Sequence, residues 1–347
     1  MPCKLQLTDV LSMSSLRQSF PRMPISVGLV IPVFNRAHLI QQTIESALAQ
    51  STAFDEIIVI DDGSTDNIVD VIAGFGEQIQ FFRQPNQGVQ IARNYGVSCC
   101  TCEWVVLCDS DDLLMPSFLE RFTQWSQSHP SNDVIYCNFH LFGSINFAED
   151  KLASCPFDYL KDSRIEDDFA FDIPDLLNRN LRFQPFFSSG CMIRRSFFKA
   201  LNGYDSKFNG IGAEDWDFTL RAIVSGRVAF CLLPLLKIRR HSGNDSANQL
   251  HMSLGEIAVL RTSGFREWPL SREDCVEVAR QISIRSTSAL NSAFAAEQFD
   301  LVIELYSSIN SSDRNWRHYL KFLISLSPGF VRRLVLLLIR TRQRDVE

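Results

Sequence analysis

Short, wholly apolar runs alternate with stretches of helical periodicity along the first third of this 347-residue chain. The predicted strands are residues 25–31, 56–60, 79–83 and 104–108, and the predicted helices between them are residues 38–50, 68–75 and 88–97. Strands that are apolar on both sides and are joined through helices are typical of a parallel sheet that helices cover on both faces. The pattern therefore predicts an α/β fold.

A cluster of polar residues follows each predicted strand. The clusters are Phe34–Asn35–Arg36, Asp61–Asp62, Asn86–Gln87 with Arg93–Asn94, and Asp109–Ser110–Asp111–Asp112. Taken singly, each of them is better explained as a surface turn or a helix cap. Because ligands of open α/β sheets bind at the carboxyl ends of the strands, four clusters on one edge together predict a binding site.

The residue types in these clusters suit a phosphate-bearing ligand and a divalent cation. The carboxylates of residues 109–112 repel one another unless a cation or hydrogen-bond donors offset their charge, and Mg²⁺ or Mn²⁺ is a natural partner. His241 follows another predicted strand, and an imidazole ligand would favour Mn²⁺, although a solvated loop histidine is the simpler interpretation. Arg93 can reach a phosphate, or it can be an ordinary surface arginine.

Two common phosphate-binding motifs are missing from the sequence. No GxGxxG follows the first predicted strand, and no GxxxxGK[ST] occurs anywhere, which argues against a dinucleotide-dependent dehydrogenase and a P-loop enzyme. Glu214–Asp215 opens a predicted helix. These carboxylates either stabilise the positive end of the helix dipole or supply a general base for an acceptor hydroxyl.

The composition excludes several other classes of protein. A net charge of −6 disfavours a nucleic-acid partner, and 46% hydrophobic residues exclude a disordered chain. No secretory or membrane-spanning segment is visible, and ten scattered cysteines predict reduced thiols in a cytoplasmic protein. Residues 99–102 contain a CxxC spacing, for which packing is the favoured interpretation over metal or redox chemistry.

Taken in order, the motifs resemble those of the family 2 glycosyltransferases, which have the nucleotide-diphospho-sugar transferase (GT-A) fold. The matching segments are residues 30–35, 56–66, 86–88 with 92–94, 107–112, 190–193, 214–216 and 241–244. The resemblance covers about residues 25–250. It implies a mainly parallel sheet flanked by helices, and a C-terminal helical region follows it.

The resemblance also implies an activity and assigns roles to individual residues. It implies that a sugar passes from a nucleotide-diphosphate donor, which we expect to be a UDP-sugar, with inversion at the anomeric carbon. By this analogy Pro32, Phe34, Asn35, Asp61, Asp62, Arg93 and Asp109 would bind the nucleotide-sugar, Asp111 and His241 would hold Mn²⁺ or Mg²⁺, Asp215 would be the catalytic base and Glu214 would orient the acceptor.

We expect three parts along the chain: an N-terminal extension (1–24), the catalytic domain (25–250) and a C-terminal helical region (251–347). The polar, acidic stretch 144–180 is expected to be an insertion or a mobile loop, and it leaves the acceptor open. From Arg314 onward the chain holds eight basic and two acidic residues. This basic tail, with the apolar run 334–339, would either lie on an anionic membrane surface or pack against the catalytic domain.

The resulting hypothesis is a cytoplasmic, metal-dependent inverting glycosyltransferase. If its tail binds lipid, we expect it at the inner membrane surface. Its acceptor would be a saccharide or a lipid-linked glycan in cell-surface polysaccharide synthesis. One alternative is a catalytically inactive glycosyltransferase-like binding protein. The other is a nucleotidyltransferase, which the loop at residues 32–35 disfavours because it lacks glycine and basic residues.

Overall fold

The computed structural model describes residues 25–143, 150–240, 248–262, 268 and 270–333. Within these residues ten strands form one mixed sheet in the order β3-β2-β1-β4-β9-β6-β10-β8-β7, and β5 pairs with β10. The strands are β1 (Val27–Val33), β2 (Glu56–Asp61), β3 (Gln80–Arg83), β4 (Trp104–Leu107), β5 (Leu113–Leu114), β6 (Val134–Gly143), β7 (Arg164–Glu166), β8 (Phe169–Phe171), β9 (Cys191–Arg194) and β10 (Val228–Arg240).

The first four strands are parallel, as the sequence predicts. β1 pairs with β2 on one side and with β4 on the other, and all seven residues of β1 are buried. β9 is antiparallel to both β4 and β6, so it separates two groups of parallel strands. The carboxyl ends of β1, β2 and β4 therefore lie at one edge of the sheet, where the polar clusters follow them.

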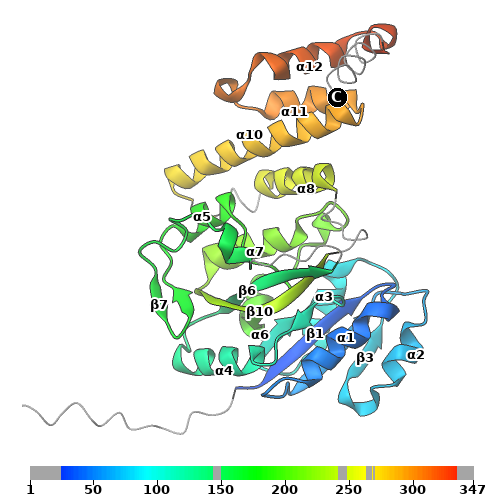
Figure 1. The fold of residues 1–347 in the computed structure, drawn as a ribbon, viewed down its shortest axis with the longest axis vertical. Helices are drawn as coiled ribbons and strands as arrows, with labels where there is room; N and C mark the ends of the chain where they lie inside the picture. Colours follow the sequence, from blue (N-terminus) through cyan, green and yellow to red (C-terminus); the bar gives the residue numbers. More distant parts are fainter. Residues whose placement is uncertain (1–24, 144–149, 241–247, 263–267, 269, 334–347) are drawn as a thin grey trace, which may run out of the picture.

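Helices cover both faces of the sheet (Figure 1). They are α1 (Ala37–Leu48), α2 (Ile68–Ala73), α3 (Val89–Cys99), α4 (Phe118–Ser128), α5 (Leu176–Arg182), α6 (Arg195–Ala200) and α7 (Glu214–Ser225). The two sides of the sheet carry separate apolar cores, one around Leu29 and Phe122, the other around Val30 and Phe230. A Cβ added to Gly96 would lie 2.3 Å from Val30, so this glycine lets α3 approach β1 closely.

Residues 150–180 are more regular than the expected insertion or mobile loop. β8 pairs with β10 and β7 pairs with β8, so this stretch extends the central sheet. The strands are only three residues long, and aspartates with left-handed backbone conformations stand at the turns around them. These residues are Asp162, Asp167, Asp168, Asp172 and Asp175. The acidic composition of the stretch thus reflects turn chemistry; residues 144–149 lie outside the described part.

The C-terminal helices stack away from the sheet in Figure 1, with α12 farthest from it. They are α8 (Gln249–Arg261), α10 (Arg272–Ala295), α11 (Phe299–Ser308) and α12 (Trp316–Leu326). A Cβ added to Gly255 would lie 2.3 Å from the carbonyl oxygen of Ile211, so α8 packs directly on the loop before α7. Among the helices of the described residues, none combines the length and the apolar character needed to cross a bilayer.

Candidate active site

A cavity of about 520 Å³ opens at the carboxyl edge of the parallel strands. This volume is within the range of ordinary small-molecule sites. Its walls come from the ends of β1, β4 and β10, the first turns of α3, α7 and α8, and the loops at residues 187–189 and 209–213. Of the residues predicted from the sequence, it is lined by Pro32, Phe34, Asp62, Arg93, Asp109, Asp111, Glu214 and Asp215.

Asp62 is fixed at the cavity wall by three hydrogen bonds. Its Oδ1 accepts from the backbone N–H of Gln87 at 2.9 Å and from the side chain of Gln84 at 2.7 Å, and its Oδ2 accepts from the N–H of Gly88 at 2.7 Å. A carboxylate held in this way keeps one orientation and presents its remaining lone pairs. The loop at residues 86–88 is tied to the end of β2 by the same bonds.

Asp61 and Asn35 stand behind this wall and do not line the cavity. Asp61 is fully buried, where it accepts from the N–H of Ser64 at 2.8 Å and pairs with Arg83 at 3.2 Å. Asn35, whose backbone is left-handed, accepts from the N–H of Thr65 through its Oδ1 at 2.8 Å. The structure therefore gives both residues contacts that shape the loops behind this wall.

Arg93 is a buried cation that faces the cavity. Its Nη2 donates to Oδ1 of Asp109 at 2.7 Å, and its guanidinium lies 5.2 Å from the centre of the Tyr204 ring. Burial disfavours the charge, but Asp109, Tyr204 and Glu214 together raise the pKa of Arg93 above its ordinary value. Within the described structure its Nε and Nη1 have no hydrogen-bond partner. Buried donors without partners at a cavity wall are suited to an anionic ligand.

The carboxylates after β4 are held by basic side chains and a backbone N–H group. Asp111 forms an ion pair with Arg36, and the backbone N–H of Arg239 donates to Asp112 at 2.9 Å. Burial, together with the charges of Asp111 and Asp109, raises the pKa of Asp112 well above its usual range. This donor set fits a hard divalent cation, and a cation at Asp111 would compete with Arg36. The second predicted ligand, His241, lies outside the described residues.

Asp215 lines the same cavity from the start of α7. It lies in the first turn of α7, half-buried beside Glu214. Burial first, and then the charge of Glu214, raises the pKa of Asp215 to about 7, while Arg93 acts in the other direction. A carboxylate whose pKa is near neutrality is suited to accept a proton at physiological pH.

The pH dependence of turnover should report this carboxylate. Asp215 is the base that the resemblance implies, and a base must be deprotonated to act. On that assignment we expect kcat/KM to rise with pH and to level off above about 7. Removing the negative charge of Glu214 in Glu214→Gln lowers the pKa of Asp215, so the rise should move to lower pH. Initial rates from pH 5 to 9 measure both curves, and a Glu214→Gln profile that does not move would contradict the coupling.

Several residues that line the cavity were not predicted. Arg36 was part of a predicted cluster but had no role, and its pairing with Asp111 depends on folding. Ser189 accepts from the N–H of Asp109 at 3.2 Å, and Asn209 donates to the carbonyl of Gln87 at 2.8 Å. His251 reaches the wall from α8, where the sequence showed no catalytic cluster. The one sequence feature that could have indicated this wall is the pair Gly210 and Gly212. Both line the cavity and have left-handed backbone conformations.

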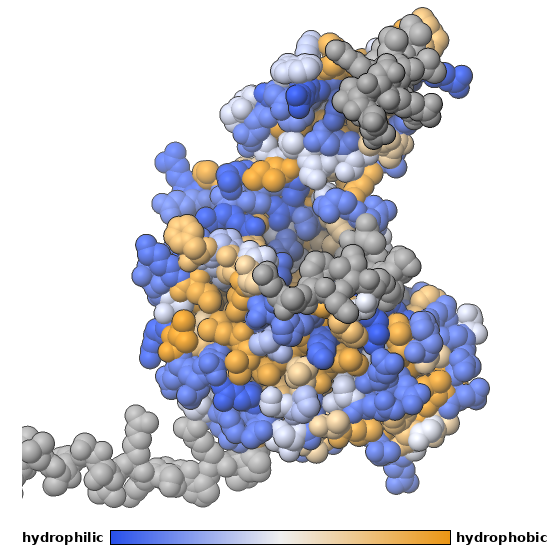
Figure 2. Space-filling view, in the orientation of Figure 1, coloured by the Kyte–Doolittle hydropathy of each residue, from blue (hydrophilic) through white to orange (hydrophobic). Residues whose placement is uncertain are grey.

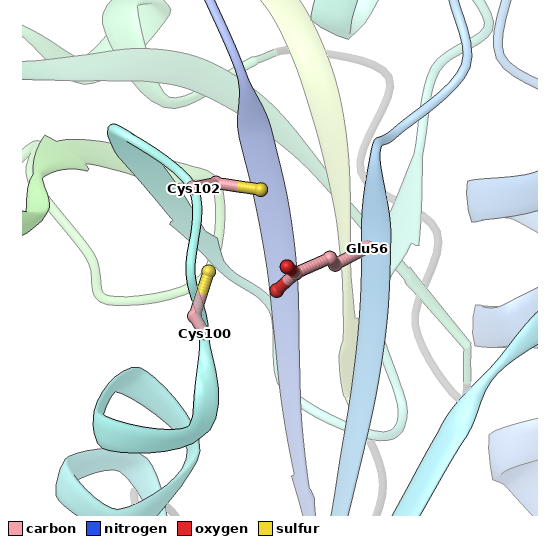
Figure 3. A group of neighbouring side chains, drawn as sticks. All are labelled: Glu56, Cys100 and Cys102. Atoms are coloured by element: carbon pink, nitrogen blue, oxygen red, sulfur yellow. The ribbon is translucent and has the colours of Figure 1, made fainter.

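A second group of potential metal ligands lies away from this cavity. Glu56, Cys100 and Cys102 point toward one another across β1, with their ligand atoms within 4.8 Å of one another (Figure 3). Both oxygens of Glu56 already accept hydrogen bonds from Thr101, and burial raises the pKa of Cys100 to about 12. The thiols are therefore protonated at neutral pH, which agrees with the packing interpretation of this cysteine-rich segment.

The fold and the cavity define an α/β protein whose candidate ligand site lies at the carboxyl edge of a mixed sheet. Residues 29–201 match the family described as glycosyl transferase family 2, and residues 173–241 match the N-terminal domain of galactosyltransferase. The chain belongs to glycosyltransferase family 2 and has the GT-A fold.

Relatives and solved structures agree with this assignment. An uncharacterized glycosyltransferase of Rickettsia typhi is 35% identical over 33% of this chain and 36% of its own length. A PGL/p-HBAD biosynthesis glycosyltransferase of Mycobacterium tuberculosis is 28% identical over 56% of this chain and 68% of its own length. TarS of S. aureus, solved in complex with UDP-GlcNAc, has a TM-score of 0.62 at 16% identity, covering 82% of each chain. The match thus spans about a third of the Rickettsia relative.

Proposed function

We propose that this chain is an inverting glycosyltransferase that transfers a sugar from a UDP-sugar to a hydroxyl group of a saccharide or lipid-linked glycan. The observation that carries the proposal is that one cavity is lined both by buried Arg93, which has unpartnered donors, and by Asp215, whose pKa is about 7. The TarS structure with UDP-GlcNAc supports a uridine donor. The PGL/p-HBAD relative supports a role in cell-surface glycan synthesis.

On the donor side, Pro32 and Phe34 line the wall where the base and ribose would lie, and Asp62 offers oriented acceptors for the N3–H group of uracil. Arg93 would donate to the diphosphate or to the sugar. Asp109 holds Arg93 and faces the same space. Asn35 and Asp61 maintain the loops behind this wall.

On the acceptor side, Asp215 would accept the proton of the acceptor hydroxyl while Glu214 orients it. The oxygen then bonds to the anomeric carbon, the bond from that carbon to the diphosphate oxygen breaks, and UDP leaves with the electron pair. Displacement in a single step inverts the anomeric centre. Asp111, with His241 as a second ligand, would hold Mn²⁺ or Mg²⁺, which offsets charge on the leaving diphosphate when bound.

We also propose limits for the catalytic domain and a location in the cell. We take residues 25–250 as the catalytic part and the remainder as a helical region, although α8 begins before that boundary, at Gln249. We propose a cytoplasmic location at the inner membrane surface, where lipid-linked acceptors occur. The run 334–339, which the sequence suggested as the membrane contact, lies outside the described residues.

A panel of nucleotide-sugars tests the proposal directly. We expect a UDP-sugar, and no GDP- or dTDP-sugar, to raise the melting temperature in the presence of Mn²⁺; a ligand at 100 times its Kd stabilises by about 2.7 kcal/mol. Release of UDP on addition of an acceptor should follow. Stabilisation without turnover on any acceptor would support the inactive binding protein, and release of pyrophosphate would support a nucleotidyltransferase.

A further inference from the structure

The outer face of α12 is a row of large apolar side chains. Trp316, Tyr319, Leu320, Leu323 and Leu326 recur at helical spacing, and Phe330 continues the row after Pro328. Their exposed fractions are 70%, 51%, 46%, 40%, 56% and 75%. We call these six residues the α12 face. Isolated exposed apolar residues are normal on proteins, but a contiguous row of this kind marks an interaction surface.

The fold holds the α12 face outward. The opposite side of the helix contains buried His318, Ile324 and Ser325, and Phe322 stacks on Tyr306 of α11 with ring centres 4.4 Å apart. Asn315 caps the first turn by accepting from the N–H groups of Arg317 and His318. Helix α12 is therefore anchored on one side, and its apolar side needs no rearrangement to reach a partner.

The charge around the α12 face is wholly positive. Residues 314–333 contain five basic and no acidic residues, whereas the preceding stretch 271–313 contains seven acidic and three basic ones. Arg317 lies over the ring of Trp316 with its guanidinium 5.6 Å from the ring centre, and Arg332 lies 4.8 Å from the ring centre of Phe299. Arg314 donates to the carbonyl of Ile309 and Lys321 donates to Asn291 of α10, so these two side chains are directed toward the neighbouring helices. The exposed side chains of Arg317 and Arg333 are the positive charges beside the α12 face.

We propose that the α12 face docks on an anionic lipid bilayer. Aromatic and leucine side chains flanked by arginine and lysine match the apolar boundary and the phosphate groups of such a surface. A symmetric contact between two copies is disfavoured because it would bring the positive charges of Arg317 and Arg333 against the same charges of the second copy. Figure 2 shows hydrophobic residues beside hydrophilic ones at this end of the molecule. The proposal does not depend on the transfer activity.

Vesicle flotation with the full chain tests this proposal. We expect binding to vesicles of equal phosphatidylglycerol and phosphatidylcholine, and at least tenfold weaker binding to phosphatidylcholine alone. Trp316→Ser/Leu320→Ser/Phe330→Ser removes apolar contact, and Arg317→Glu/Arg333→Glu reverses two charges. Each variant should bind the anionic vesicles at least tenfold more weakly than the unaltered protein. For the charge variant this follows because each basic side chain near such a surface contributes about fivefold, so two contribute about 25-fold.

The matched control is Phe157→Ser/Ile165→Ser, which removes two side chains that are 98% and 58% exposed on the sheet domain. This control should float like the unaltered protein. Circular dichroism and UDP binding would verify that each variant is folded. Equal binding to both vesicle types, no binding, or undiminished binding by the triple variant would overturn the proposal. So would light scattering that shows a dimer which the triple variant converts to a monomer.

Discussion

Asp215→Asn should lower kcat about 1,000-fold and leave the affinity for the UDP-sugar nearly unchanged. Asparagine preserves the size of the side chain but cannot accept a proton at neutral pH, and a general base contributes roughly 10²–10⁴-fold to such a rate. Steady-state kinetics with a saturating donor measures the loss, and calorimetric titration with UDP measures binding. The two readouts separate a lost base from a lost fold.

Asp300→Asn is the matched control for this substitution. Asp300 also lies in the first turn of a helix, α11, but it is exposed and lies outside the cavity. Its removal changes the charge at a helix start without touching the site, so turnover should remain unchanged. Full activity of Asp215→Asn would remove Asp215 from the role of base.

Asp111→Ala should abolish the dependence of UDP affinity on Mn²⁺. In the unaltered protein we expect Mn²⁺ to strengthen UDP binding at least tenfold, which corresponds to about 1.4 kcal/mol. Removing this carboxylate takes away the ligand assigned to the cation, so UDP should bind with one weak affinity whether or not Mn²⁺ is present. Calorimetric titration of UDP in Mn²⁺ and in EDTA gives both values.

The ion pair between Asp111 and Arg36 calls for a second variant, because Asp111→Ala also leaves Arg36 without this partner. Arg36→Ala removes the competing cation and keeps the carboxylate. It should preserve or increase the effect of Mn²⁺, whereas a purely structural pair would give similar losses in both variants. An unaltered effect of Mn²⁺ in Asp111→Ala would assign the cation elsewhere.

The parallel half of the sheet was predictable because its signals are local. β1, β2 and β4 are continuous buried runs, and each ends in a polar cluster that the folded chain brings to one cavity. The clusters were informative jointly, since any single Asp–Gly or Asn–Gln–Gly sequence also forms a turn. The resemblance added the functional assignments, which periodicity alone does not provide.

The remainder depended on contacts between distant parts of the chain. β7 and β8 are three residues long, too short to show a period, and they are strands because β10 offers them an edge. The aromatic stretch that begins at Phe183 forms a strand only at Cys191–Arg194, where β4 and β6 offer it partners. His251 lines the cavity because α8 packs on the loop before α7, a long-range contact that its own sequence does not indicate.

The packing of α8 on that loop has a consequence for how the chain can be divided. Gly255 meets the carbonyl groups of Ile211 and Gly212, four and three residues before Asp215. The helical region is therefore part of the framework that sets the position of the proposed base. A fragment ending at residue 250 would retain the walls that follow β1 and β4 but would lose this support. The two parts of the chain are therefore not independent modules. Exchanging the helical region between relatives should therefore change the position of the loop before α7, and with it the position of the proposed base.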